Sequence, residues 1–150
     1  MVIRPMCEQD IPAVLVLGKA MHQESAYRDM TFSADKCEKL IMWLLASPLA
    51  FTVVAVDDGG KLCGIMAAHI AQHYFSSDYM IEDYLLYVRP EKRGGTIAMR
   101  LVSQFVEWAE KQNVKMIMCG ISTEIETEKI IKLYQHFGFH TAGVLMRRNP

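Results

Sequence analysis

Hydrophobic positions recur with a helical period near the start of the chain. Apolar residues follow one another at three- and four-residue steps over 11–21 and again over 37–45, which predicts two amphipathic helices. Asp10 precedes the first helix and Ser33 the second, and both residue types are favourable N-caps. The short segment "VIRPM" before them predicts an opening strand.

The middle of the chain has the pattern of consecutive strands. "AFTVVAV" (50–56) is a continuous apolar run rich in valine, and Asp57–Gly60 after it is a hairpin turn signal. Two longer apolar runs follow over 61–75 and 79–88. Gly64, inside the first of these, is a candidate β-bulge.

Helical and strand patterns alternate over the last third. We expect a helix over about 94–112, a short strand over 114–120, a helix over 127–138 and a final strand over 139–146. The order β-α-α-β-β-β-α-β-α-β predicts an α/β (α+β) fold with a mixed central sheet and helices on both faces. Because no linker or repeat interrupts the pattern, residues 1–150 are expected to form a single domain.

The composition and net charge exclude some classes of binding partner. A chain with 51% hydrophobic residues and a net charge of −1 has no field to recruit nucleic acid or an anionic membrane. The four cysteines form no CxxC pair and no secretory leader is evident, so we expect free thiols and a cytoplasmic protein. The uncharged run 40–56 is interrupted by Ser47-Pro48 and falls short of the roughly 20 residues of a membrane span.

The segment "EKRGG" lies where the strand pattern of 79–88 gives way to a helical pattern. A helix N-terminus leaves amides unpaired and attracts anions, and glycines let a ligand approach the backbone. Arg93 adds a cation and Thr96 a hydroxyl donor, so this turn is a candidate phosphate site. The alternative is a tight turn that needs glycine for geometry alone. Neither GxxxxGK[ST] nor GxGxxG occurs, which excludes a standard P-loop and a Rossmann dinucleotide site.

The segment "LYVRPEKRGGTIAMRLV" resembles the coenzyme A signature of the GNAT superfamily of N-acetyltransferases. That signature is a strand ending in V-x-P, followed by Q/R-x-x-G-x-G/A at the start of a helix. Arg93, Thr96 and Ala98 occupy the signature positions, with Gly94 and Gly95 between them. Thr96 departs from the glycine that is usual in the family.

A second segment, "TEKIIKLYQHFGF", resembles the family's N-x-x-A-x-x-L-Y-x-x-x-G-F. Thr127 replaces the asparagine and Ile130 the alanine. The order of elements also resembles the family's GNAT-like, mostly antiparallel sheet. The two motifs occupy about 82–139.

The resemblance implies acetyl-CoA as cofactor and no metal. It places the pantetheine arm as a pseudo-strand between the strands "IEDYLLYV" and "VKMIMCG", bonded to backbone groups at Leu86 and Val88. The cofactor-binding residues that it implies are Leu86, Tyr87, Val88, Arg93, Gly94, Gly95, Thr96, Ile97, Ala98, Thr127, Ile130 and Tyr134.

The resemblance also suggests catalytic residues. Tyr134 matches the family tyrosine that acts as general acid for the departing thiolate; the alternative is an aromatic residue of the core. Glu82 and Asp83 are candidates for the general base. Strand alternation sends them to opposite faces, and alignment with other members favours Glu82 over Asp83.

The family's acceptor site is built from the segment between the first two helices and from the turn between the third and fourth strands. A carboxylate beside aromatic rings there would suit a cationic amine. The candidates are His22, Glu24, Tyr27, Arg28, Tyr74 and Phe75, each of which could also be a loop residue without a ligand.

Two histidine pairs, His69 with His73 and His136 with His140, are spaced four apart. They lack cysteine or acidic partners at ligand spacing, so no metal site is expected.

The sequence therefore predicts an acetyl-CoA-dependent N-acetyltransferase that transfers acetyl directly to a primary amine of a small molecule. The alternatives are a non-catalytic sensor of coenzyme A or acyl-CoA and an unrelated α/β nucleotide-binding domain. Many members of the family pair through their sheets, so a homodimer is a further expectation.

Overall fold

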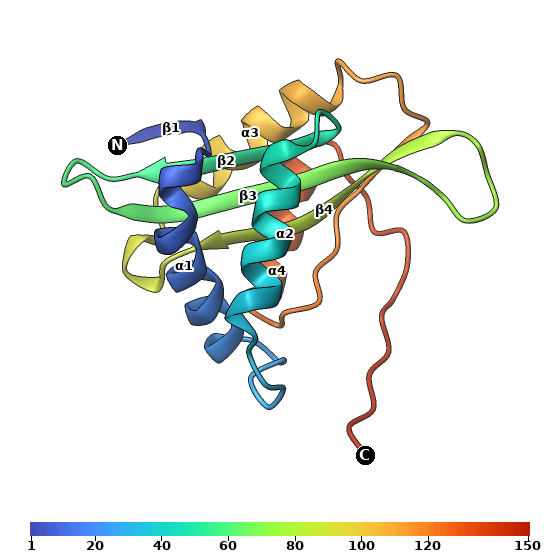
Figure 1. The fold of residues 1–150 in the computed structure, drawn as a ribbon. Helices are drawn as coiled ribbons and strands as arrows, with labels where there is room; N and C mark the ends of the chain where they lie inside the picture. The colour runs from blue at the N-terminus through green and yellow to red at the C-terminus, as the bar shows by residue number, and fades with distance from the viewer.

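A five-stranded sheet forms the centre of the computed structural model, which describes residues 1–150 (Figure 1). Its strands lie side by side in chain order, and every neighbouring pair is antiparallel except β4 with β5, which is parallel. The strands are β1 (Val2–Pro5), β2 (Ala50–Val56), β3 (Leu62–Gln72), β4 (Tyr79–Val88) and β5 (Met116–Met118). The predicted mixed, mostly antiparallel sheet is confirmed.

Helices cover both faces of the sheet, as predicted. The elements are α1 (Ile11–Glu24), α2 (Ala34–Ala46), α3 (Ile97–Ala109) and α4 (Thr127–His136), with short 3₁₀ turns at Glu8–Asp10 and Pro90–Lys92. Leu17 of α1 and Ile41 of α2 pack with Ile65 on one face. Phe105 of α3 packs with Met66 on the other. Because β2 and β3 are covered on both faces, they read as continuous apolar runs in the sequence.

The starts of the first two helices are stabilised in different ways. Ser33 is the predicted N-cap of α2, and its hydroxyl accepts a hydrogen bond from the Lys36 amide at 3.3 Å. Asp10 does not cap α1 with its side chain. Its buried carboxylate instead accepts two hydrogen bonds from the Arg4 guanidinium, at 2.7 and 2.8 Å, and one from the Cys7 amide at 2.9 Å. Asp10 therefore ties β1 to the start of α1.

Gly64 is not the bulge residue that the sequence suggested. It pairs with Ala55, and the register shift lies beside it, where Cys63 has no partner on β2. A Cβ at Gly64 would lie 3.2 Å from the Leu101 side chain and 3.2 Å from the Tyr87 carbonyl. Glycine therefore lets α3 approach the sheet closely here, where a larger residue would be crowded.

The predicted final strand over 139–146 does not form. Residues 139–150 have no regular structure, and the tail runs away from the sheet (Figure 1). A strand needs a neighbour to pair its backbone groups, whereas the tail is held by a side chain. Arg147 donates to the Ser122 carbonyl at 2.7 Å and to Glu124 at 2.6 Å, and its guanidinium lies 5.0 Å from the centre of the Tyr27 ring.

Two further features bear on the predictions from composition. All four cysteines are free thiols. None of the helices is both long and apolar enough to cross a membrane.

Candidate active site

The sheet opens at the middle of β4. The parallel pairing with β5 runs only from Met80 to Glu82, opposite Met116–Met118. Beyond Glu82 the two chains separate, and the rest of β4 pairs with β3 alone. The register with β3 also shifts at this point and leaves Tyr84 without a partner, which is the signature of a β-bulge. Backbone groups along 83–88 therefore have a free side.

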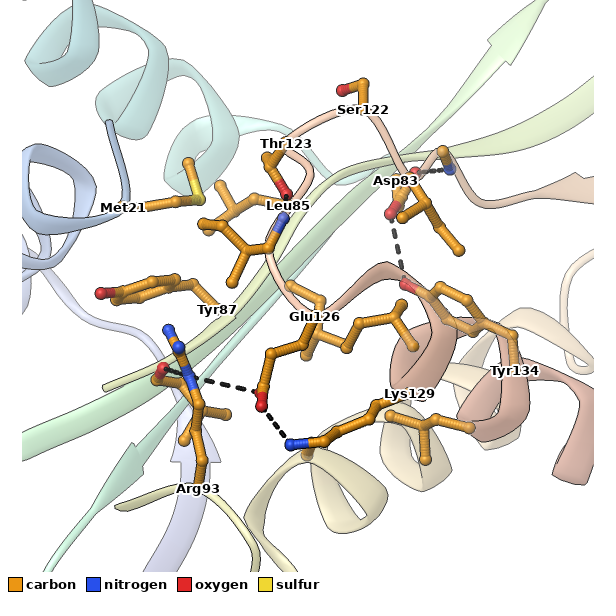
Figure 2. Close-up of a pocket in the computed structure, with 18 of the residues that line it drawn as sticks. Met21, Asp83, Leu85, Tyr87, Arg93, Ser122, Thr123, Glu126, Lys129 and Tyr134 are labelled. Atoms are coloured by element: carbon orange, nitrogen blue, oxygen red, sulfur yellow. Dashed lines mark hydrogen bonds and ion pairs between the residues drawn. The ribbon is translucent and has the colours of Figure 1, made fainter. Parts of the chain in front are cut away.

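A cleft of about 290 Å³ lies against this free edge. Its other walls come from the segment 120–126 after β5, the turn before α3, and α4 (Figure 2). Most of the predicted cofactor-binding residues line the cleft together. They are Leu86, Tyr87, Val88, Arg93, Gly94, Gly95, Ala98, Ile130 and Tyr134.

Three predicted cofactor residues do not line the cleft. Ile97 is buried in the core beneath α3. Thr96 is exposed directly before α3, and Thr127 is the first residue of α4. The side chains of these residues lie outside the cleft, although Thr96 and Ile97 belong to the turn that borders it.

The glycine turn leaves the start of α3 open. Gly94 has a φ of +81°, a conformation that favours glycine, and a Cβ at Gly94 or Gly95 would meet no other atom within 4 Å. Thr96 makes no side-chain cap. The first amides of α3 therefore have neither a helical partner nor a cap, in contrast to α2 with its Ser33 cap.

Arg93 is engaged by carboxylates. It binds Glu24 through both terminal nitrogens, one of them at 2.8 Å, and its Nε donates to the Val88 carbonyl at 2.9 Å. Glu126 lies 3.8 Å from the same Nε (Figure 2). The Tyr87 hydroxyl donates to Glu24 at 3.1 Å. The hydrogen bond from Arg93 lowers the pKa of Glu24. Glu24, predicted to bind the acceptor, thus faces the glycine turn.

A carboxylate and a phenol meet at the other end of the cleft. The buried Tyr134 hydroxyl donates to Asp83 over 3.4 Å, and the Gly120 amide donates to the other Asp83 oxygen at 2.7 Å (Figure 2). Burial raises the pKa of Asp83 to about 6, although the Gly120 bond opposes this shift. Burial also raises the pKa of Tyr134, and the Asp83 charge adds to the effect. Glu82 does not line the cleft, whereas Asp83 does.

The predicted acceptor residues are not brought together. None of the six lines the cleft. Tyr74 and Phe75 lie at the β3–β4 turn with 91% and 74% of their surface exposed. The His22 ring is bonded to the Met30 carbonyl at 2.8 Å, and Tyr27 lies beneath the Arg147 guanidinium. Arg28 borders a small polar hollow beside the tail.

The segment 120–126 was missed by sequence reasoning. It contributes Gly120, Ser122, Thr123 and Glu126 to the cleft wall, and Lys129 follows from α4. A usable signal was the strand–helix–strand order over 79–120, which favours parallel pairing of the two strands. The carboxyl ends of two parallel strands lie at the same edge, so residues directly after the second strand face the end of the first.

Comparison with known proteins connects this geometry with a family. Residues 19–139 match the model of the acetyltransferase (GNAT) family. The chain belongs to this family. The predicted family and fold class are therefore confirmed.

An uncharacterized N-acetyltransferase of Schizosaccharomyces pombe is 32% identical over 95 residues, which are 63% of this chain and 54% of that protein. The chain thus spans about half the length of this curated relative.

Solved structures share the fold. The aminoglycoside 6'-N-acetyltransferase AAC(6')-IG of Acinetobacter haemolyticus has a TM-score of 0.75 at 18% identity, covering 100% of this chain and 98% of its own. AAC(6')-Iy, in complex with the bisubstrate analogue CoA-S-monomethyl-acetylneamine, has a TM-score of 0.76 at 19% identity, covering 99% and 97%.

Proposed function

We propose that the chain is an acetyl-CoA-dependent N-acetyltransferase that transfers acetyl directly to a primary amine of a small molecule. One observation carries the proposal: a single cleft joins the uncapped start of α3, the free edge of β4 and the Asp83–Tyr134 pair. Those are the features needed to hold an anionic carrier, an extended arm and a reacting group in line.

The residues of the cleft suit coenzyme A. The amides of the 94–96 turn and of the first turn of α3 would hold the diphosphate, since they have no cap and the glycines leave space. Backbone groups at Leu86 and Val88 would bond the pantetheine arm along the free edge. Arg93 is bonded to Glu24 and to the Val88 carbonyl, so its guanidinium stabilises the turn. The backbone amides would therefore contribute more of the anion binding than the sequence suggested. Bound there, acetyl-CoA would supply the acetyl thioester.

Transfer forms an amide C–N bond and breaks a thioester C–S bond, so one proton must leave nitrogen and one must reach sulfur. Tyr134 is protonated at neutral pH and lines the cleft, so its hydroxyl can donate a proton to the departing sulfur. Asp83, with a pKa of about 6, is ionised at neutral pH and can accept a proton. The cleft thus favours Asp83 over Glu82 as the base.

Direct transfer is supported by the chemistry of Cys119. Burial and the Asp83 charge raise the pKa of this thiol, so it stays protonated and is a poor nucleophile. A small-molecule acceptor is supported by the aminoglycoside acetyltransferases among the solved structures. The four free cysteines support a location in the cytoplasm.

Two measurements test the proposal. Calorimetry with coenzyme A measures binding, and chromatographic detection of free coenzyme A measures turnover of acetyl-CoA with a panel of primary amines. We expect binding, together with amine-dependent release and an acetylated product. Binding without release would favour the sensor alternative, and the absence of binding would overturn the assignment of the cleft. ATP and NAD are the control ligands for the nucleotide-binding alternative.

A further inference from the structure

Three aromatic rings from different elements meet on the face of the sheet that α2 covers. Trp43 of α2 lies edge-on to His69 of β3 at 5.9 Å and to Tyr84 of β4 at 6.3 Å. His69 and Tyr84 lie against each other at 4.8 Å with their planes tilted by 32°. We call these three residues the aromatic corner. Trp43 keeps 48% and Tyr84 40% of its surface exposed, so the corner has open aromatic surface.

The aromatic corner adjoins the cleft at the bulge of β4. Tyr84 lines the cleft and directly follows Asp83, the proposed base. Asp83 contacts Tyr134 of α4 on the opposite face of the sheet. Figure 1 shows α2 lying across β3 and β4, so the corner borders the α2 side of the opening. An amine that enters from that side passes the corner before it reaches Asp83.

Charges around the opening argue against a polycationic acceptor. Glu24 is paired with Arg93, Glu126 with Lys129 and Glu124 with Arg147. Beside the aromatic corner, β4 carries a carboxylate at Glu82. It is paired in register with His69 and takes part in none of the ion pairs of the structure. An acceptor would therefore find aromatic surface and, on β4, the carboxylates of Glu82 and Asp83 without a cation partner.

We propose that the aromatic corner is the acceptor subsite and that the acceptor is a primary amine joined by a short linker to a flat aromatic ring. The ring packs against Trp43 and Tyr84, and Glu82 attracts the protonated amine. This proposal rests on the proposed function and names its substrate class.

Turnover of matched amines tests the substrate class. The probes are 2-phenylethylamine and tryptamine, 2-cyclohexylethylamine as a saturated analogue of similar size, and spermidine and neamine as polycations. We expect kcat/KM for the aromatic amines to exceed that of each of the others by about 10-fold or more. Equal or higher values for the saturated amine or the polycations would overturn the proposal while leaving the acetyltransferase function intact.

Variants of the corner test its role. Trp43→Ala and Tyr84→Leu should each raise KM for 2-phenylethylamine by about 10-fold. Because Trp43 does not line the cleft, Trp43→Ala should change kcat little and the affinity for coenzyme A not at all. Trp43→Phe keeps a ring and should retain most of the affinity. Met42→Ala is the matched control, because Met42 is the neighbouring residue of α2 and is 55% exposed. An unchanged KM in both corner variants would overturn the proposal.

A binding measurement separates this proposal from the proposed function. Titration with 2-phenylethylamine should change the fluorescence of the unmodified protein, and the change should be lost in Trp43→Phe. If no amine in the panel is turned over, the proposed function fails. The titration still tests whether the aromatic corner binds an aromatic amine. A saturable change that requires Trp43 supports the subsite, and no change overturns it.

Discussion

Asp83 and Glu82 are neighbours on β4, yet their surroundings give them different chemistry. Asp83 is directed toward α4, where burial raises its pKa to about 6 and Tyr134 and Gly120 donate to it. Glu82 is in register with His69 on the α2 face, outside the cleft. Alternation along the strand predicted the separation, but not which carboxylate would be buried.

Asp83 should give the pH–rate profile its acidic limb. If Asp83 is the base, kcat/KM should rise with pH through about 6 as the carboxyl group ionises. Asp83→Asn should lose this limb and lower kcat/KM by about 10²–10⁴-fold. Glu82→Gln is the control and should keep the limb. A limb that survives in Asp83→Asn would assign the base elsewhere.

The same carboxyl group should make stability depend on pH. Its folded-state pKa of about 6 lies above the ordinary value of 3.8, so the folded state binds its proton more tightly and stability falls as pH rises from about 4 to 6. Asp83→Asn should therefore be more stable than the unmodified chain at pH 7, by up to about 3 kcal/mol, and similar to it at pH 4. Urea unfolding at both pH values measures the difference.

Tyr134 should contribute to turnover rather than to cofactor affinity. Tyr134→Phe keeps the buried ring but removes the proton donor, so kcat should fall by about 10²-fold while the dissociation constant of coenzyme A changes little. Steady-state kinetics and calorimetry measure the two quantities. Full turnover by the phenylalanine variant would remove Tyr134 from the mechanism.

At the scale of elements, α1 is attached to the sheet by a partly buried charge pair as well as by apolar packing. The Arg4 hydrogen bonds lower the pKa of Asp10 to about 2. Because this is below the ordinary 3.8, the stabilisation is present above about pH 4 and is lost as pH falls toward 2.

Asp10→Asn should lower the free energy of unfolding at pH 7 by about 2–4 kcal/mol, since it leaves Arg4 without its partner. The deficit should shrink below pH 3, as measured by urea unfolding. Asp35→Asn is the control, because Asp35 forms an exposed pair with Lys39 at 2.9 Å and should change stability by at most about 0.5 kcal/mol.

Glycines in two elements should respond in opposite ways to an added side chain. Gly64→Val would place atoms 3.2 Å from Leu101 and 3.3 Å from Ile97, forcing α3 off the sheet at a cost of about 1–3 kcal/mol. Gly18 lies within α1 with no atom near its Cβ position. Gly18→Ala should therefore stabilise the protein by about 0.5–1 kcal/mol. Thermal unfolding compares the two, and a destabilised Gly18→Ala would contradict the open space seen there.

At the scale of the whole molecule, the cleft joins segments that are far apart in the chain. Glu24 at the end of α1 binds Arg93 in the turn before α3, and Arg93 lies near Glu126 at the start of α4. Ligand binding in the cleft should therefore stabilise the fold as a unit.

Coenzyme A at about 100 times its dissociation constant should add about 2.7 kcal/mol of stability. For a chain of 150 residues that is a rise in Tm of about 5–10 °C. ATP and NAD at equal concentration should give a smaller rise. A rise of equal size with all three would favour the nucleotide-binding alternative. The homodimer stays a prediction, which sedimentation or light scattering can measure.

The sequence by itself determined most of the elements and the family. Periodicity predicted β4 over 79–88 with the bounds that the structure has, and the turn signal at Asp57–Gly60 placed the β2–β3 hairpin. Most of the residues predicted from the glycine turn and the motif around Tyr134 line the cleft. These features are local: capping, turns and amphipathic faces depend on residues a few positions apart.

Only the tertiary structure decided which groups meet across the chain. It paired Arg93 with Glu24, buried Asp83 rather than Glu82, brought Trp43 beside His69 and Tyr84, and left 139–146 without a partner strand. Each outcome depends on the path of a distant segment, because charge pairing, burial and strand pairing are set by neighbours in space and not by neighbours in sequence.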